Sequence, residues 1–275
     1  MRLGIFAKTF AGTRPLAVLQ AARDAGFAAV QYNMACSGLA SMPDDIPPGV
    51  TAAIAQASDA TGMAIAAVSG TYNMVHPDKY QRDQGMRRLG LLIANARAMG
   101  TGMVTLCTGT RDPQDQWRGH PDNALATTWA LLCTQMAKAA ALAETHGITL
   151  GIEPELANVV SDAGKARLLI DTLQSPNIAI VLDPANLFEV TTLPQQRRII
   201  SHAVDLLADR TVMAHAKDRD ARGGFVAAGQ GVVDFDHFLA ALQMAGFNGD
   251  LVAHGLPAQQ AAGVARFLTD RLNSL

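Results

Sequence analysis

Three short polar segments, each placed directly after an apolar run, contain the residues of this chain best suited to chemistry. They are Ile152–Glu155, Leu182–Asn186 about thirty residues later, and Ala214–Asp218 about thirty residues after that. Carboxylate and imidazole donors suit a divalent metal ion such as Mn²⁺, Co²⁺, Zn²⁺ or Mg²⁺. Polar groups that recur at strand ends predict a metal site on one face of a barrel.

Four candidate metal ligands follow four consecutive runs of strand length. Glu153, Asp183 and His215 close the fifth, sixth and seventh runs, and His254 follows the eighth. A carboxylate at the end of a buried strand is costly without a partner, and a metal ion supplies one. Asp183 could instead begin a turn at Pro184. His215, taken alone in its apolar run, would more often be a core residue. The prediction therefore depends on the whole set.

Other polar side chains are expected to bind a substrate. Asn73 and His76 follow the third run, and Trp117 and Arg118 lie in the longer loop after the fourth. Aromatic rings pack on the C–H face of a sugar, while amide, guanidinium and imidazole groups bond its hydroxyls. Each of these residues also fits an ordinary solvated loop. Trp117 is the strongest candidate, because an exposed indole leaves a large apolar surface uncovered.

Three further residues belong to the polar segments themselves. Glu155 and Asn186 are candidate substrate-binding residues beside the predicted ligands. Lys217, two residues beyond His215, points to the same rim and either binds a substrate oxygen or pairs with Asp218 or Glu155.

Eight apolar runs of strand length alternate with amphipathic stretches typical of helices. The expected strands are Leu3–Ala7, Ala28–Tyr32, Ala64–Ser69, Met103–Cys107, Ile148–Ile152, Ile178–Leu182, Val212–Ala216 and Leu251–Ala253. Five helical stretches end near a glycine, which indicates one repeated unit. We therefore predict a single (β/α)8 barrel domain over residues 1–275. An open doubly wound sheet is the second choice, and no GxGxxG or Walker motif supports it.

Composition limits the class of partner. The 275 residues are 49% hydrophobic and 17% charged, with a formal net charge of −2 and no Lys/Arg-rich run, so nucleic acid is not expected. No apolar stretch is long enough for a membrane span, and the first apolar run is too short for a signal peptide. Three widely separated cysteines fit reduced thiols in the cytoplasm. The loop over residues 111–123 is long enough to support a homo-oligomer.

The chemical segments resemble the sugar phosphate isomerase/epimerase family, the xylose isomerase-like barrels that also include ketose 3-epimerases, inosose dehydratases and AP endonucleases. The resemblance spans nearly the whole chain and rests on Gly151–Glu155, Asn158–Val160, Ser175–Asn177, Val181–Asn186, His215–Asp218 and Gly229–Asp234. It implies that Glu153, Asp183 and His215 bind a divalent metal ion with a fourth ligand, usually a glutamate after the eighth strand.

The chain departs from that pattern at His254, which stands where many relatives carry the second glutamate. In the family's epimerases, the two glutamates exchange a proton on opposite faces of the substrate while the metal polarises the carbonyl. His254 is expected either to bind the metal or to act as an acid or base near neutral pH. Asn186 occupies a position where some relatives have histidine, and its amide orients a hydroxyl without titrating.

The first functional expectation is a metal-dependent isomerase or epimerase that removes a proton next to the carbonyl of a sugar or keto-polyol. Its catalytic residues would be Glu153, His254 and Lys217. A lyase or dehydratase, which tolerates unlike acid and base groups, is the first alternative, and a non-catalytic sugar-binding subunit is the second. AP endonuclease activity is a weaker alternative, because the extra ligands of those barrels have no counterparts on strands two to four.

Overall fold

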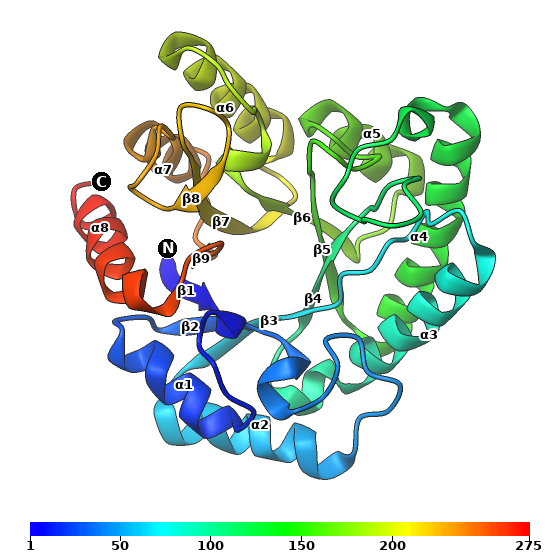
Figure 1. The fold of residues 1–275 in the computed structure, drawn as a ribbon, viewed down its shortest axis with the longest axis horizontal. Helices are drawn as coiled ribbons and strands as arrows, with labels where there is room; N and C mark the ends of the chain where they lie inside the picture. The colour runs from blue at the N-terminus through cyan, green and yellow to red at the C-terminus, as the bar shows by residue number, and fades with distance from the viewer.

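The computed structural model describes residues 1–275 as a closed parallel barrel surrounded by helices (Figure 1). The eight barrel strands are β1 (Arg2–Phe6), β2 (Ala29–Tyr32), β3 (Ala64–Ser69), β4 (Met103–Cys107), β5 (Thr149–Glu153), β6 (Ile178–Leu182), β7 (Thr211–Arg219) and β9 (Asp250–Ala253). Each strand pairs with the next in parallel, and β9 closes the ring by pairing with both β7 and β1. The predicted (β/α)8 barrel is confirmed.

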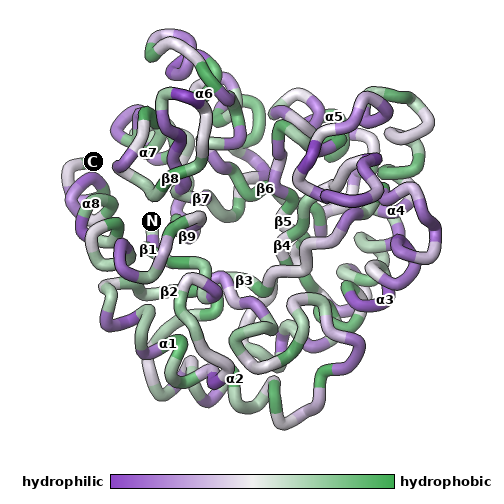
Figure 2. The backbone as a smooth tube through the Cα atoms, in the orientation of Figure 1, coloured by the Kyte–Doolittle hydropathy of each residue, from purple (hydrophilic) through white to green (hydrophobic).

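Eight α-helices form the outer ring. They are α1 (Pro15–Asp24), α2 (Pro48–Thr61), α3 (Lys79–Ala96), α4 (Ala126–His146), α5 (Ala163–Leu173), α6 (Leu193–Leu207), α7 (Phe235–Met244) and α8 (Ala261–Asn273). Hydrophobic and hydrophilic residues alternate along them (Figure 2), so that each helix packs one apolar face on the barrel. None of the helices is both long and apolar enough to cross a membrane.

Buried side chains divide between the space outside the strands and the barrel interior. Sixty-six buried residues form one apolar cluster, which joins the outward faces of the strands to the helices. A separate cluster of six, which includes Ala29, Val181 and Met213, belongs to the opposite strand faces. Because side chains alternate along a strand, Ala29 shares its face with Gln31, and Met213 shares its face with His215. The barrel interior is therefore apolar at one end and polar at the carboxyl ends of the strands.

β7 continues beyond the barrel rim, where it forms an antiparallel pair with the short strand β8 (Phe225–Ala227). The sequence predicted β7 only as far as Ala216, and it did not predict β8. The buried Asp218 carboxylate holds the following loop, since it accepts hydrogen bonds from the backbone N–H groups of Gly229, Gly231 and Val233 at 2.9 to 3.0 Å. This extension brings Lys217 and Arg219 to the rim.

Candidate functional site

The structure brings Glu153, Asp183 and His215 together at the carboxyl ends of three neighbouring strands. Glu153 is the last residue of β5, Asp183 follows β6 directly, and His215 lies on β7. One ligand atom from each residue lies within 4.8 Å of the others, and all three side chains are buried. Glu153, Asp183 and His215 are called the ligand trio below.

Hydrogen bonds fix the orientation of His215. Its Nδ1 lies 3.0 Å from Glu153 Oε1, and its Nε2 lies 2.7 Å from Gln31 Oε1. Gln31 Nε2 in turn donates to Thr105 Oγ1 at 2.9 Å, which leaves the Gln31 oxygen free to accept from Nε2–H. Asn186 Nδ2 also donates to Glu153 Oε1, at 2.9 Å. Because Nε2–H can donate to Gln31, Nδ1 is the ring nitrogen that faces the Glu153 carboxylate.

Gln31 and Thr105 were not among the site residues predicted from the sequence. The sequence did contain one signal: Gln31 is a polar residue on the same strand face as Ala29. A buried amide inside a barrel needs a polar partner, here Thr105. Their strands were predicted, but Gln31 on β2 contacts Thr105 on β4 and His215 on β7, and only closure of the barrel brings these strands together.

Charges in and beside the trio shift the pKa values of all three residues. Burial opposes the charge on Glu153, but His215 and Lys217 outweigh it and lower the pKa of the carboxyl to about 2. Burial alone would lower the pKa of His215, yet the charge of Glu153 raises it. Burial raises the pKa of Asp183 against the opposing charge of Lys217. Glu153 is therefore ionised at neutral pH.

Lys217 pairs with Asp183, with Nζ 3.2 Å from Oδ2. The sequence analysis offered Asp218 or Glu155 as its protein partner, and the structure corrects this. Neighbouring residues on a strand point to opposite faces, so Asp218 faces the loop that it organises, while Lys217 faces the site. Burial would lower the pKa of Lys217, but the surrounding carboxylates, first among them Asp183, raise it.

The donor set of the trio fits a divalent metal ion. Two carboxylates and one imidazole form a donor set that is compatible with Mn²⁺, Co²⁺, Zn²⁺ or Mg²⁺. His215 Nδ1 and the Glu153 oxygen lie 3.0 Å apart, a position that either a shared proton or a metal ion can bridge. Asp183 Oδ2 is buried and makes no well-directed hydrogen bond, although Lys217 is close. The Asp183 oxygen without a hydrogen bond, beside two further ligand atoms, favours a bound cation.

His254 lies beside the trio and not within it. Its ring stacks between Phe6 and His215, with centroid distances of 4.6 and 5.2 Å. No His254 nitrogen joins the group of ligand atoms that lie within 4.8 Å of one another. Its Nδ1 is buried without a hydrogen-bond partner, and burial, reinforced by His215 and Lys217, lowers the pKa of the ring to about 3. The imidazole is thus neutral at physiological pH.

A cavity of about 590 Å³ opens above these residues. It is lined by Trp117, Glu155, Leu156, Ala157, Asn186, Glu189, Lys217, Arg219, Phe225, His254 and Gly255. Burial and the charge of Glu153 raise the pKa of Glu155 to about 7, and the Cys107 thiol lies 3.8 Å from its Oε1. The cavity is called the rim cavity below. It has a polar floor next to the trio and an apolar mouth formed by Trp117, Leu156 and Phe225.

Two of the predicted substrate-binding residues lie away from the rim cavity. Asn73 Nδ2 donates to Thr110 O at 2.8 Å, and its Oδ1 accepts from Thr110 N at 3.0 Å, so it joins two loops. The His76 ring lies 3.2 Å from Pro113 O and accepts from Asp78 N. Both residues line a separate polar cavity of about 350 Å³.

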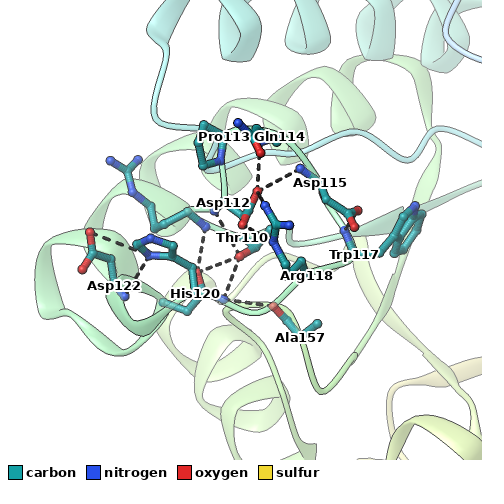
Figure 3. A network of polar contacts seen from close by, with 12 residues as sticks. Thr110, Asp112, Pro113, Gln114, Asp115, Trp117, Arg118, His120, Asp122 and Ala157 are labelled. Carbon is teal, nitrogen blue, oxygen red and sulfur yellow. Dashed lines mark hydrogen bonds and ion pairs between the residues drawn. The ribbon is translucent and has the colours of Figure 1, made fainter.

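Trp117 and Arg118 point to different places from one loop. Arg118 forms two hydrogen bonds with Asp112, from Nε to Oδ2 at 2.6 Å and from Nη2 to Oδ1 at 3.0 Å (Figure 3). That cation, with two backbone N–H groups, lowers the pKa of Asp112. Arg118 therefore stabilises the loop, whereas Trp117, half-exposed, lines the mouth of the rim cavity.

Comparison with known proteins places the chain among related barrels. The family model described as xylose isomerase-like TIM barrel matches residues 19–269. A 3-keto-D-glucoside 4-epimerase, YcjR, from E. coli superposes with a TM-score of 0.79 at 15% identity, covering 98% of this chain and 99% of that one. An L-ribulose 3-epimerase has a TM-score of 0.78 at 19% identity, with 99% and 95% covered.

A third solved structure, the IolI protein with a binding zinc atom, has a TM-score of 0.73 at 14% identity and covers 100% of this chain and 99% of that one. At these identities the likeness to solved structures establishes the fold alone. A search of curated proteins gave no match. The family model matches most of the chain, and the protein belongs to the xylose isomerase-like TIM barrel family.

Proposed function

We propose that this protein is a metal-dependent isomerase or epimerase that acts on a sugar or keto-polyol by removing a proton next to a carbonyl. The observation that carries the proposal is the buried ligand trio, with an ionised Glu153, directly beneath the lining residues Asn186, Lys217 and His254 of a cavity large enough for a sugar. The printed names of two structural neighbours, a 3-keto-D-glucoside 4-epimerase and an L-ribulose 3-epimerase, are in accord with it.

Glu153, Asp183 and His215 would hold the metal ion. When bound, such an ion polarises a substrate carbonyl and so acidifies the neighbouring C–H bond. Glu153 would accept the proton, since its carboxylate is ionised at neutral pH and is hydrogen-bonded to Asn186, which lines the rim cavity. Asn186 holds that carboxylate at 2.9 Å, and its amide also faces the rim cavity, where it can orient a substrate hydroxyl.

Proton return distinguishes isomerisation from epimerisation. In isomerisation, Glu153 gives the proton back to the adjacent carbon, so that one base suffices. In epimerisation a second group delivers a proton to the opposite face. His254 is neutral and holds no proton to give at neutral pH, whereas the Lys217 ammonium holds one. Because its raised pKa makes Lys217 a weak acid, Glu155, with a pKa of about 7, is the better candidate donor, while Lys217 would stabilise negative charge on a substrate oxygen and His254 forms a wall of the site.

A dehydratase on the same site is the second candidate, and Glu155 favours it. With a pKa of about 7, this carboxyl is partly protonated at neutral pH and lines the rim cavity. Elimination needs a base for the C–H proton and a separate acid for the departing hydroxyl group. Glu153 and Glu155 differ in protonation state in the way that these two roles require.

The test combines metal content with hydrogen exchange. We expect about one divalent ion per chain by mass spectrometry, and deuterium incorporation next to the carbonyl for at least one ketose in a panel. Glu153→Gln should weaken metal binding and lower exchange by at least about 10²-fold, because the base is lost. Glu144→Gln on the exposed face of α4 is the matched control and should behave as wild type.

His254→Ala separates the roles around the site. If His254 only forms a wall, this variant keeps its metal and loses part of its exchange rate, whereas loss of the metal would make it a ligand. A wild-type protein with neither metal nor exchange would sink the catalytic proposal and leave a sugar-binding barrel as the better account.

A further inference from the structure

Arg219 is a buried cation without a carboxylate partner. Its side chain belongs to a residue only 6% exposed, yet no Asp or Glu oxygen lies within ion-pair distance of it. Lys217, two residues earlier, has Asp183 at 3.2 Å. A buried charge is costly unless another charge or several hydrogen bonds compensate it. Burial accordingly lowers the pKa of the Arg219 guanidinium.

Neutral groups hold the guanidinium in one orientation. Nε donates to Ala185 O and Nη1 donates to Gly223 O, each at 2.5 Å. The guanidinium carbon lies 4.0 Å from the centroid of the Phe225 ring, which is directly opposite Arg219 in the β7–β8 pair. A guanidinium has five N–H donors, and Nη2 forms no hydrogen bond within the protein. Arg219 lines the rim cavity, so a fixed donor group is available to a ligand there.

Alternation along β7 places Arg219 on the same side as the catalytic floor. His215, Lys217 and Arg219 occupy alternate positions of one strand. A strand rises about 3.3 Å per residue, so Arg219 stands roughly 13 Å along the strand from His215. A group bound by Arg219 would lie at the outer end of the cavity, away from a carbonyl polarised by a metal ion on the trio.

We propose that Arg219 binds a carboxylate or phosphate group at the end of the substrate remote from its carbonyl; the assignment of that substrate as a keto-sugar rests on the proposed function. Arginine binds both anions through paired N–H groups in one plane. The ring of Phe225 covers the guanidinium from one side, with its centroid 4.0 Å from the guanidinium carbon. The substrate class is therefore an acidic or phosphorylated sugar.

Other charges at the cavity leave room for an anion. Asp183 compensates Lys217, with Oδ2 3.2 Å from Nζ, so the Lys217 charge is already paired within the protein. Glu189 is exposed at the mouth and is the strongest opposing charge near Arg219. This exposed carboxylate would compete with an anionic ligand for the guanidinium.

Calorimetry on the full as-purified chain tests the proposal with sorbitol, gluconate and sorbitol 6-phosphate as probes. We expect at least one anionic probe to bind about tenfold more tightly than sorbitol, and the better of the two identifies carboxylate or phosphate. Arg219→Gln should abolish the preference. Arg222→Gln, which removes the same charge from an exposed position on the hairpin turn, should retain it.

Equal binding of the three probes by wild type, or a preference that survives Arg219→Gln, overturns the proposal. A preference that survives Arg219→Gln would also be the result if the metal site, and not Arg219, held the carboxylate of the probe. Glu189→Gln offers a test that does not disturb a buried residue: anion affinity should rise several-fold, and an unchanged affinity counts against the site. These measurements need no turnover. If the protein has no metal and shows no hydrogen exchange, the proposed function is wrong. The probe affinities then still decide, on their own, whether Arg219 binds an anion.

Discussion

Gln31 determines which nitrogen of His215 faces the rest of the trio. Its amide oxygen lies 2.7 Å from Nε2, and its amide nitrogen is already committed to Thr105. A histidine ligand whose other nitrogen is hydrogen-bonded keeps one tautomer and one ring orientation. Gln31 therefore prepares Nδ1 as a metal ligand without touching the metal itself.

Replacement of Gln31 by methionine, which has a similar length and no acceptor oxygen, should weaken metal binding by roughly 10–100-fold. The reason is that His215 loses the partner that fixes its tautomer. Competition titration with a chromogenic chelator measures the affinity. Thr105→Val removes only the hydrogen bond between Gln31 and Thr105 and should weaken metal binding less. Equal metal affinity in wild type and Gln31→Met would exclude this orienting role.

His254 should make stability depend on pH. Its pKa is about 3 in the folded protein and about 6.5 in an unfolded chain. The folded state excludes the proton, so the stabilisation is complete above pH 6.5 and is lost as the pH falls toward 3. Between pH 7 and pH 5 the loss is about 2 kcal/mol.

The variant His254→Phe keeps a ring between Phe6 and His215 but does not titrate. Its free energy of unfolding in urea should fall less than that of wild type between pH 7 and pH 5, by about the same 2 kcal/mol. Measurements of both proteins at pH 8 give the effect of the substitution itself. Parallel curves for the two proteins would show that His254 protonates in the folded state.

At the scale of elements, the β7–β8 hairpin depends on a close backbone approach at Gly231. A side-chain carbon there would lie 2.1 Å from Arg219 O and 2.4 Å from Asp218 Oδ1. Both contacts are too short for any relaxed structure, and one of them involves backbone. The loop that follows the hairpin therefore needs glycine where it crosses β7.

Gly231→Ala should lower the free energy of unfolding by about 1–3 kcal/mol, as expected for a side chain forced into filled space. Gly263→Ala is the matched control, because Gly263 is exposed on α8 with open space around it. That control should be neutral or more stable by up to about 1 kcal/mol, since alanine favours a helix. Chemical denaturation of both variants measures the difference, and a stable Gly231→Ala protein would contradict the prediction.

For the whole molecule, metal binding joins three strands that are distant in sequence, so it should stabilise the fold. A ligand that binds only the folded state contributes about 2.7 kcal/mol at a free concentration 100 times its Kd. For a chain of this length the melting temperature should rise by roughly 5–10 °C. Thermal unfolding with added Mn²⁺, Co²⁺ or Zn²⁺, and after chelation, measures the shift.

Asp183→Asn should lose most of that shift, because a neutral amide is a weaker ligand than a carboxylate. Asp171→Asn, on the exposed surface of α5, carries the same chemical change away from the site and should keep it. A full shift in the Asp183 variant would mean that the stabilising metal binds elsewhere.

The alternation of apolar runs and amphipathic stretches predicted the barrel and most of its strands closely. β3, β4 and β6 have the expected bounds, and Gly62 and Gly147 end α2 and α4 in the left-handed conformation as expected. The prediction failed beyond the rim, where β7 runs on to Arg219 and pairs with β8. Lys217–Arg219 is polar, and polar residues give no apolar run from which a strand can be inferred.

Sequence by itself determined the family, the fold and the convergence of the trio, because parallel strands of a barrel end on one face and residues at those ends must meet there. Only the tertiary structure decided the partners of the polar side chains: Lys217 with Asp183, His215 with Gln31, Asn73 with Thr110, and Arg219 with no carboxylate. Such pairings depend on distances of a few ångströms between residues far apart in the chain, and periodicity along the sequence does not encode them.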